Sequence, residues 1–488
     1  MTSTPLPIIL DIAVLAIGLI ALLLEAFEEN KNKSIIQWLC IGGIGIVFVL
    51  SFFMKPITFA ETSQLAQFYS ADSFAIFYKR LALGSTLLVL IMAKEFKGIL
   101  SRYLPAAVPG AGVGEFFALP LLTCLGLMWM ASAVDFVMAF VSIELVTISF
   151  YILVSYMRRN ALSLEAGVKY LILGALSTGF LVYGITWIYG ATGETNFARI
   201  SEAIRLSAPD MYPAILFGMA LILVGLGFKI AAAPFQLWVA DVYQGAPTPI
   251  TAFLSVGSKA AGFILLMRVL NWLVIVPAVP ALSGKLMAAL WGMAILTLIY
   301  GNLAAMPQGN MKRLLAFSSV AHAGYLLVSL ASWKPLTSQV TVSYYLAGYL
   351  LMTMLSFLIL VIINRATGGD DIASFNGLSR RSPFLAFGML VSMVSLAGVP
   401  FTVGFFGKFL VFRDAIEQNQ WALVAVAILS VGAGFYYYLK VVRAMYWKAP
   451  SETGAITVSP LARVTICILS ALIFLLGTYP APVLAMLK

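Results

Sequence analysis

Charged residues are scarce in this sequence of 488 residues: only 10% are Asp, Glu, Lys or Arg, whereas 61% are hydrophobic. Soluble domains carry about 25% charged residues, so this composition cannot supply the surface of a soluble protein. Apolar runs of about 20 residues, each long enough to cross a hydrocarbon core of about 30 Å, account for the excess. The composition therefore predicts a protein that crosses a membrane many times.

Cysteine and histidine are also rare, with three Cys and one His in the chain. Cys40, Cys124 and Cys467 lie far apart and form no CxxC pair, which excludes an iron–sulfur cluster, a c-type haem or a metal site held by this chain alone.

Lys and Arg exceed Asp and Glu by 30 to 20, but no basic run is interleaved with aromatic residues outside the apolar segments. Nucleic acid is therefore excluded as a partner. The sequence also has no Walker loop, no HExxH motif and no serine nucleophile elbow.

Fourteen apolar segments account for most of the chain. Each is long enough for a membrane-spanning helix, and the absence of an alternating polar pattern favours helices over a barrel. The predicted fold is thus all-α and polytopic, with about 14 transmembrane helices. The segments cover residues 6–26, 35–54, 74–93, 116–133, 136–157, 168–190, 212–240, 249–271, 285–305, 313–332, 340–364, 384–413, 421–447 and 460–480.

The distribution of Lys and Arg between the loops indicates the orientation. The loops that follow odd-numbered segments carry more Lys and Arg than the loops that follow even-numbered ones. Because cytoplasmic loops are enriched in positive residues, the odd-numbered loops are predicted to be cytoplasmic. Both termini are then predicted to lie on the periplasmic side.

Two segments, 212–240 and 384–413, are too long for one straight crossing at about 1.5 Å per residue. Each contains an internal proline, Pro234 or Pro400, beside small residues, and proline interrupts a helix. Interrupted helices at corresponding places in two halves indicate inverted repeats. The two segments are five helices apart, and this odd offset reverses direction in the membrane. The predicted organisation is a three-helix segment 1–110, a five-helix repeat 111–275, its inverted copy 276–450, and a C-terminal helix 451–488.

A few ionisable residues fall deep within the apolar segments, where each charge costs a few kcal/mol and persists mainly for function. The only carboxylate placed at the middle of a segment is Glu144, and the deep basic residues are Lys229, Lys259, Lys408 and His322. These five are the predicted proton-transfer residues.

The spacing of the ionisable residues, and their positions within the segments, predict where they lie in the fold. Glu144 and His322 are 178 positions apart and Lys229 and Lys408 are 179 apart, so we expect each pair to occupy matching positions of the two repeats. Asp11 and Lys79 lie near segment ends, where we expect them to reach the membrane interface.

A lysine in a low-dielectric site gives up its proton more readily than in water, and a nearby carboxylate opposes that loss. Movement of Glu144 toward and away from Lys229 would then let the lysine gain and release a proton. The alternative is a set of buried ion pairs that only fix helix packing. One carboxylate cannot neutralise three deep lysines, so the pattern favours proton transfer.

Several long motifs resemble a known family. The run GFKIAAAPFQLWVADVYQGAPTPITAFLSVGSKAAGF (227–263) resembles the antiporter-like membrane subunits of respiratory complex I, and DVYQGAPTP (241–249) is similar to subunit N rather than to subunits L or M. The resemblance spans essentially the whole chain. It includes LEAGVKYLILGALSTGFLVYG (164–184), NMKRLLAFSSVAHAGY (310–325), LAGVPFTVGFFGKF (396–409) and YYYLKVVRAMY (436–446).

The resemblance implies a proton-translocating subunit of NADH-quinone oxidoreductase and a role for each deep residue. Glu144 is similar to the glutamate that modulates the central lysine, Lys229 to that proton-accepting lysine, and Lys259 to the connecting lysine of a broken eighth helix. Lys408 is similar to the terminal lysine that faces the exit path, with His322 on the relay between them.

The same resemblance implies that quinone reduction by NADH in partner subunits supplies the energy. This chain would then hold no cofactor, and quinone, NADH, FMN and iron–sulfur clusters would belong to partner subunits. The implied partners are the other membrane-arm subunits, protons and the lipid bilayer, and the implied location is the bacterial inner membrane.

The sequence departs from the family in one motif. Where the family commonly has PFHxWxPD, this chain has PFQLWVAD, with Gln236 for the histidine and Ala240 for the proline. Glutamine can hydrogen-bond water but cannot carry a proton as a cation, so no titrating role is assigned to Gln236. Two alternatives stay open: a subunit of a multi-subunit cation/proton antiporter or membrane-bound hydrogenase, and a non-pumping structural subunit. The electron donor, NADH or ferredoxin, is also open.

Overall fold

The computed structural model describes residues 7–27, 33–59, 64–104, 112–273, 280–450, 454 and 456–487. Regular structure in these ranges is helical, and the β contacts within them are four isolated bridges. Thirteen helical segments of the described chain are long and apolar enough to cross a membrane. They are α1 (Ile8–Phe27), α2 (Ser34–Ser51), α3 (Ser73–Tyr103), α4 (Glu115–Ser132), α5 (Phe136–Val154), α6 (Ala161–Thr192), α8 (Tyr212–Ile230), Thr248–Trp272 with α10 and α11, α12 (Pro280–Ala305), α13 (Met311–Ala331), α14 (Thr337–Thr367), α18 (Trp421–Trp447) and α19 (Pro460–Thr478).

The fourteenth predicted segment, 384–413, is divided into α16 (Pro383–Ala397) and α17 (Val403–Glu417). Gly398 ends α16 with a φ of 92°, a left-handed conformation that glycine adopts at little cost. Every predicted segment therefore has a helical counterpart, and the predicted all-α polytopic fold and the break near Pro400 are confirmed.

The break near Pro234 is confirmed as well. Helix α8 ends at Ile230, Ala231 follows with a φ of 61°, and the short helix α9 (Val239–Gly245) begins beyond the break. The backbone N–H of Ala233 donates to the hydroxyl of Thr297 on α12 at 2.9 Å. A side chain of the second repeat thus satisfies a donor freed by the break in the first.

The eighth span has a different irregularity from the one predicted. Helix α10 (Thr248–Phe253) continues through a π-helical turn, Leu254–Ser258, into α11 (Lys259–Leu273) without a gap. The span is bulged rather than interrupted, and Lys259 is the first residue after the bulge. Single π turns inside α-helices are frequent at functional sites.

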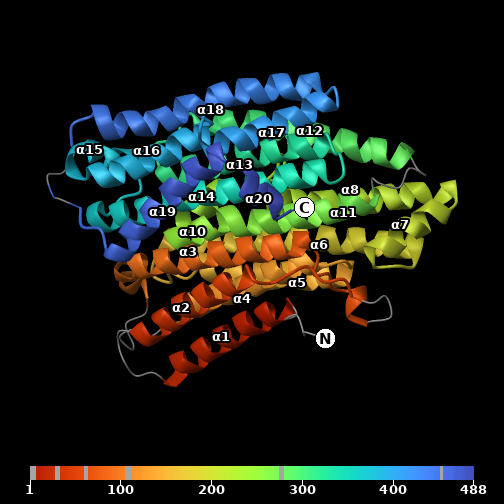
Figure 1. The fold of residues 1–488 in the computed structure, drawn as a ribbon, viewed down its shortest axis with the longest axis horizontal. Helices are drawn as coiled ribbons and strands as arrows, with labels where there is room; N and C mark the ends of the chain where they lie inside the picture. Colours follow the sequence, from red (N-terminus) through yellow and green to blue (C-terminus); the bar gives the residue numbers. More distant parts are fainter. Residues whose placement is uncertain are drawn as a thin grey trace.

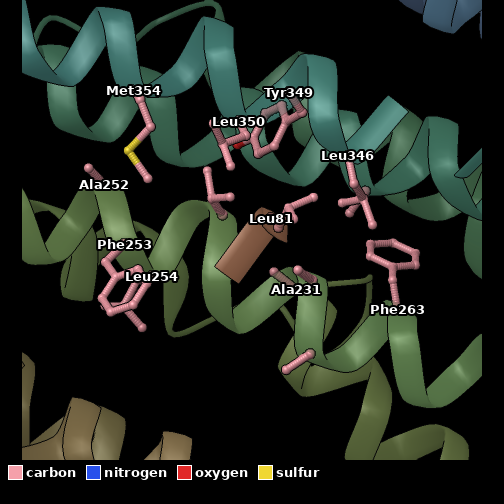
Figure 2. Packing of buried hydrophobic residues seen from close by; sticks show 14 of the residues in the cluster. Leu81, Ala231, Ala252, Phe253, Leu254, Phe263, Leu346, Tyr349, Leu350 and Met354 are labelled. Carbon is pink, nitrogen blue, oxygen red and sulfur yellow. The ribbon is translucent and has the colours of Figure 1, made fainter. Parts of the chain in front are cut away.

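The long helices lie side by side, with α1 at one edge of the molecule and α18 at the other (Figure 1). An 18-residue stretch of the α10–α11 span and one of α13 are completely buried, so these two spans lie at the centre of the bundle. Figure 2 shows Phe263 of the α10–α11 span facing Leu346 of α14, with Leu81 of α3 between the two helices. This central layer carries two of the candidate site residues, Lys259 and His322.

One pocket lies on each of two faces of the bundle. A pocket of about 700 Å³ lies where α3 and α14 begin and α11 ends, and Leu487 near the C-terminus lines it. This is the predicted periplasmic face. A second pocket, of about 1230 Å³, lies on the opposite, predicted cytoplasmic face, between Asn310, Asp371 and the end of α18.

One detail of local structure occurs twice and supports the repeat. Asp135 caps α5 and forms a β-bridge with Asn196, while Asn310 caps α13 and forms a β-bridge with Asp371. The first residues of the two bridges are 175 positions apart in the sequence, and so are the second residues. Because α5 and α13 are five spans apart, the two joints lie on opposite faces. The predicted boundaries at 110/111 and 275/276 lie outside the described residues, and the domain boundaries stay predictions.

Candidate proton-transfer site

The five predicted site residues lie on five helices of the core. Glu144 is on α5, Lys229 on α8, Lys259 on α11, His322 on α13 and Lys408 on α17. The three lysines and the histidine are at most 4% exposed, whereas Glu144 is half-buried. Four of the five are therefore enclosed by protein rather than directed toward lipid.

Lys229 is held at the last turn of α8, where helix carbonyls favour a positive charge. Its ammonium donates to the hydroxyl of Thr147 on α5 at 2.5 Å. Glu144 lies one turn before Thr147 and accepts a hydrogen bond of 2.8 Å from Thr178 on α6. In the described part of the chain, no carboxylate oxygen lies within 4.0 Å of the Lys229 ammonium.

Lys259 reaches across to α13. Its ammonium donates to the backbone carbonyl of Ser319, and the Ser319 hydroxyl donates to the phenol of Tyr243 at 3.3 Å. On the π-helical turn before Lys259, the hydroxyl of Ser255 lies 2.7 Å from that of Tyr349 on α14. Lysine, serine and tyrosine thus form a buried polar cluster at the centre of the molecule.

His322 lies between two phenols. Its Nδ1 is 2.7 Å from the hydroxyl of Tyr345, and its Nε2 is 3.1 Å from that of Tyr438. The Tyr438 hydroxyl in turn lies 2.5 Å from that of Ser318. Because an imidazole can donate at one nitrogen and accept at the other, this arrangement can pass a proton through the ring.

Lys408 binds the end of the preceding half-helix. Its ammonium donates to the carbonyls of Leu396 and Ala397 at 2.9 and 2.7 Å, and it lies 5.0 Å from the centre of the Tyr325 ring. The free carbonyls at the C-terminus of α16 carry partial negative charge, so they hold the cation without a carboxylate. A Cβ atom at Gly398 would lie 3.1 Å from this ammonium, which explains the small residue there.

Comparisons with known proteins identify the family of the chain. A family model described as NADH:quinone oxidoreductase/Mrp antiporter, TM, matches residues 133–434. The chain belongs to this family. It is 38% identical to NADH-quinone oxidoreductase subunit N of Trichlorobacter lovleyi, over 91% of this chain and 87% of that protein.

Solved structures give the same result. One chain of respiratory complex I from Thermus thermophilus is 30% identical with a TM-score of 0.80, and the match covers 98% of this chain and 99% of that one. A chain of the membrane-bound sulfane sulfur reductase, an archaeal respiratory membrane complex, is 25% identical with a TM-score of 0.83, covering 98% and 95%. This chain is therefore a multi-pass membrane protein similar over nearly its full length to subunit N.

The structure contradicts one expectation that was based on spacing, the equivalence of Lys229 and Lys408. Lys229 precedes its helix break, whereas Lys408 follows its own, and Pro234 and Pro400 are separated by 166 positions rather than 179. The two lysines lie on the corresponding spans but not at matching positions relative to the breaks. The expected equivalence is therefore wrong in this detail.

The structure also reveals a buried ion pair, whose two residues the sequence analysis placed at the membrane interface. Asp11 and Lys79 are 2% and 0% exposed, and their charged atoms lie 2.5 Å apart. The phenol of Tyr69 donates to the same carboxylate at 2.7 Å. The signal was present, because one acid and one base occur early in two apolar segments, but the pairing depends on how α1 packs near α3.

Proposed function

We propose that this chain is a proton-translocating subunit of the membrane arm of NADH-quinone oxidoreductase. One observation carries the proposal. Lys229, Lys259 and Lys408 are buried, yet in the described residues none of them has a carboxylate within 4.0 Å. An ion pair that only fixes helices would resemble Asp11 and Lys79, in which the charges are in contact.

The proposed transfer uses groups that change protonation in turn. Lys229 takes up a proton while Glu144 stabilises its charged form, and it loses that proton when the carboxylate pairs elsewhere, as with Thr178 here. Lys259 accepts next, and the Tyr349 ring of its cluster lies 5.0 Å from the His322 ring, centre to centre. Lys408 receives the proton last. Each step breaks one N–H or O–H bond and forms another, so the chain ends the cycle unchanged.

The energy and the redox chemistry would come from partner subunits. We propose that quinone, NADH, FMN and iron–sulfur clusters are bound there, and that this chain carries out no redox step. The partners would be the other membrane-arm subunits. The location would be a bacterial inner membrane, with both termini on the periplasmic side as loop charge predicts.

An antiporter or hydrogenase-type complex is the second candidate, since the sulfane sulfur reductase chain has the same fold. The higher identity to subunit N, 38% against 25%, favours the oxidoreductase. Activity that depends on sodium in proteoliposomes would favour the antiporter.

The decisive experiment replaces Lys229 with Ala in the intact complex, reconstituted in proteoliposomes. We expect proton pumping to be lost while the complex still assembles. Lys285→Ala is the matched control, because that lysine is exposed on α12 and should leave pumping unchanged. Normal pumping by assembled Lys229→Ala would favour a purely structural subunit.

A further inference from the structure

A buried carboxylate lies on the same half-helix as Lys408. Asp414 stands six residues later on α17 and is 2% exposed. Its Oδ2 accepts a hydrogen bond of 2.7 Å from the hydroxyl of Ser329, and its Oδ1 lies 3.0 Å from the guanidinium of Arg413. At about 1.5 Å per residue, Asp414 is about 9 Å closer than Lys408 to the predicted periplasmic face.

A row of polar side chains on α13 connects the relay to this carboxylate. Ser318, His322, Tyr325 and Ser329 recur at intervals of four, three and four residues, so they share one face of the helix. All four are buried. The first two belong to the His322 cluster, Tyr325 contacts the Lys408 ammonium with its ring, and Ser329 donates to Asp414.

Beyond Asp414 the polar groups reach solvent. The Arg413 side chain is 39% exposed and lies 3.7 Å from Glu417, a carboxylate at the end of α17 that is 41% exposed. Glu417 pairs with the half-exposed Lys334 in the loop before α14. Asp414 is therefore the last buried acid before the predicted periplasmic surface on this route.

The other repeat has an acid at a corresponding place on the opposite face, but the side chain of that acid is 39% exposed. Asp241 lies seven residues before Thr248, where α10 begins, and Asp414 lies seven residues before Trp421, where α18 begins. Asp241 is paired with Arg313 at 2.7 Å, on the predicted cytoplasmic side. A carboxylate–arginine pair thus lies beyond the break in each of these two helices. Only the pair beyond Lys408 is on the predicted periplasmic side, where protons would be released.

We infer that Asp414 is the proton-release carboxylate of this chain, with Ser329 as the hydroxyl that delivers the proton to it. This inference rests on the proposed function. In the step, an N–H bond of the Lys408 ammonium breaks and an O–H bond forms on Asp414, through Ser329 and intervening water. The acid then gives that proton to water at the periplasmic surface. Arg413 is placed to stabilise the carboxylate that this leaves behind.

The test uses the intact complex in proteoliposomes and compares Asp414→Asn with Asp414→Glu. Asparagine keeps the size and the hydrogen bond from Ser329 but cannot carry a proton. A positioned proton-transfer group contributes about 10²–10⁴ in rate. We expect the initial pumping rate of Asp414→Asn to fall at least about tenfold, and that of Asp414→Glu to stay within about twofold of wild type. Assembly is checked on native gels. Glu202→Gln, which removes an exposed acid from an arginine pair on the same face, is the matched control and should pump normally.

A purely structural role for Asp414 predicts different results. The double variant Arg413→Gln with Asp414→Asn removes both charges, so it should restore pumping if the acid only pairs with the arginine. If it assembles and still fails to pump, the release role is supported. If Asp414→Asn itself fails to assemble, the pumping rates of the double variant and of Ser329→Ala are measured instead. Slow pumping by both supports the release role, and normal pumping by both overturns it.

The controls separate the two proposals. Normal pumping by Asp414→Asn together with lost pumping by Lys408→Gln overturns the release role and leaves the proposed function intact. Normal pumping by Lys229→Ala and Lys408→Gln overturns the proposed function itself.

Discussion

The ammonium of Lys229 is bound to the hydroxyl of Thr147, one helical turn away from the carboxylate of Glu144 on the same helix. Glu144 is bound instead to Thr178. The lysine of α8 thus contacts α5 one turn away from its acid without pairing with it, and a threonine binds the lysine in the acid's place. A neutral partner of this kind keeps the lysine oriented while leaving its charge uncompensated.

Replacement of Thr147 with Val should slow proton transfer through Lys229. Valine has almost the shape of threonine but removes a hydrogen bond to a charged group, which contributes about 1.5–3 kcal/mol. We expect the pumping rate of the reconstituted complex to fall about tenfold, since about 1.4 kcal/mol corresponds to a factor of ten. Thr147→Ser keeps the hydroxyl and should pump nearly as fast as wild type. Equal rates for the valine and serine variants would contradict a role for this hydrogen bond.

Gly398→Ala should damage both stability and pumping. The residue has a φ of 92°, and an added Cβ would lie 3.0 Å from Cδ of Lys408. A left-handed conformation costs a residue with a side chain about 1–2 kcal/mol, and Lys408 must move as well. We expect a lower Tm of the purified chain and slower pumping. Gly432→Ala on the exposed side of α18 is the control, because a Cβ there meets no atom within 4 Å and alanine favours the helix.

Asp11→Asn should destabilise the chain strongly, because it leaves the Lys79 ammonium buried without its counter-ion. Breaking a buried pair from one side typically costs about 3–5 kcal/mol. Replacing both residues, with Asp11→Leu and Lys79→Met, removes the two charges together and should restore most of the stability. Thermal unfolding in detergent measures both effects. If the double variant is no more stable than Asp11→Asn, the pair contributes more than charge compensation.

The joint between α3 and α11 should weaken in acid. Burial alone would raise the pKa of Asp72 at the start of α3, but the Arg268 guanidinium at 2.7 Å and the backbone N–H of Ala75 outweigh it and hold the pKa below its usual 3.8. An acid whose pKa is lowered by folding stabilises the protein above about pH 4, and that contribution is lost as the pH falls through the folded value.

The measurement is the Tm of wild type and Asp72→Asn between about pH 7 and about pH 3. Asparagine also caps helices, so the variant isolates the charge. We expect the variant to be less stable at neutral pH and the difference to shrink in acid. A difference that is constant across this range would show that the Asp72 charge does not matter.

Much of this architecture follows from the sequence, because apolar length and proline position determine spans and breaks directly. Lys229, Lys259, His322 and Lys408 could be found because a charge in the middle of an apolar run has few explanations. Charges nearer the segment ends were harder to place. Asp11, Lys79 and Asp414 are buried only because neighbouring helices cover them, and that packing leaves no mark in the local sequence.

The π-helical turn before Lys259 determines the direction in which every later side chain of that span points. Such a turn accommodates one residue more than an ordinary one, and each residue of an α-helix advances the azimuth by about 100°. Taking one residue out of Leu254–Ser258 would therefore rotate Lys259 by roughly a quarter of a revolution, away from the Ser319 carbonyl. Arg268, about two and a half turns further on, would rotate away from Asp72. One surplus residue keeps the middle and the far end of the span in phase with their partners.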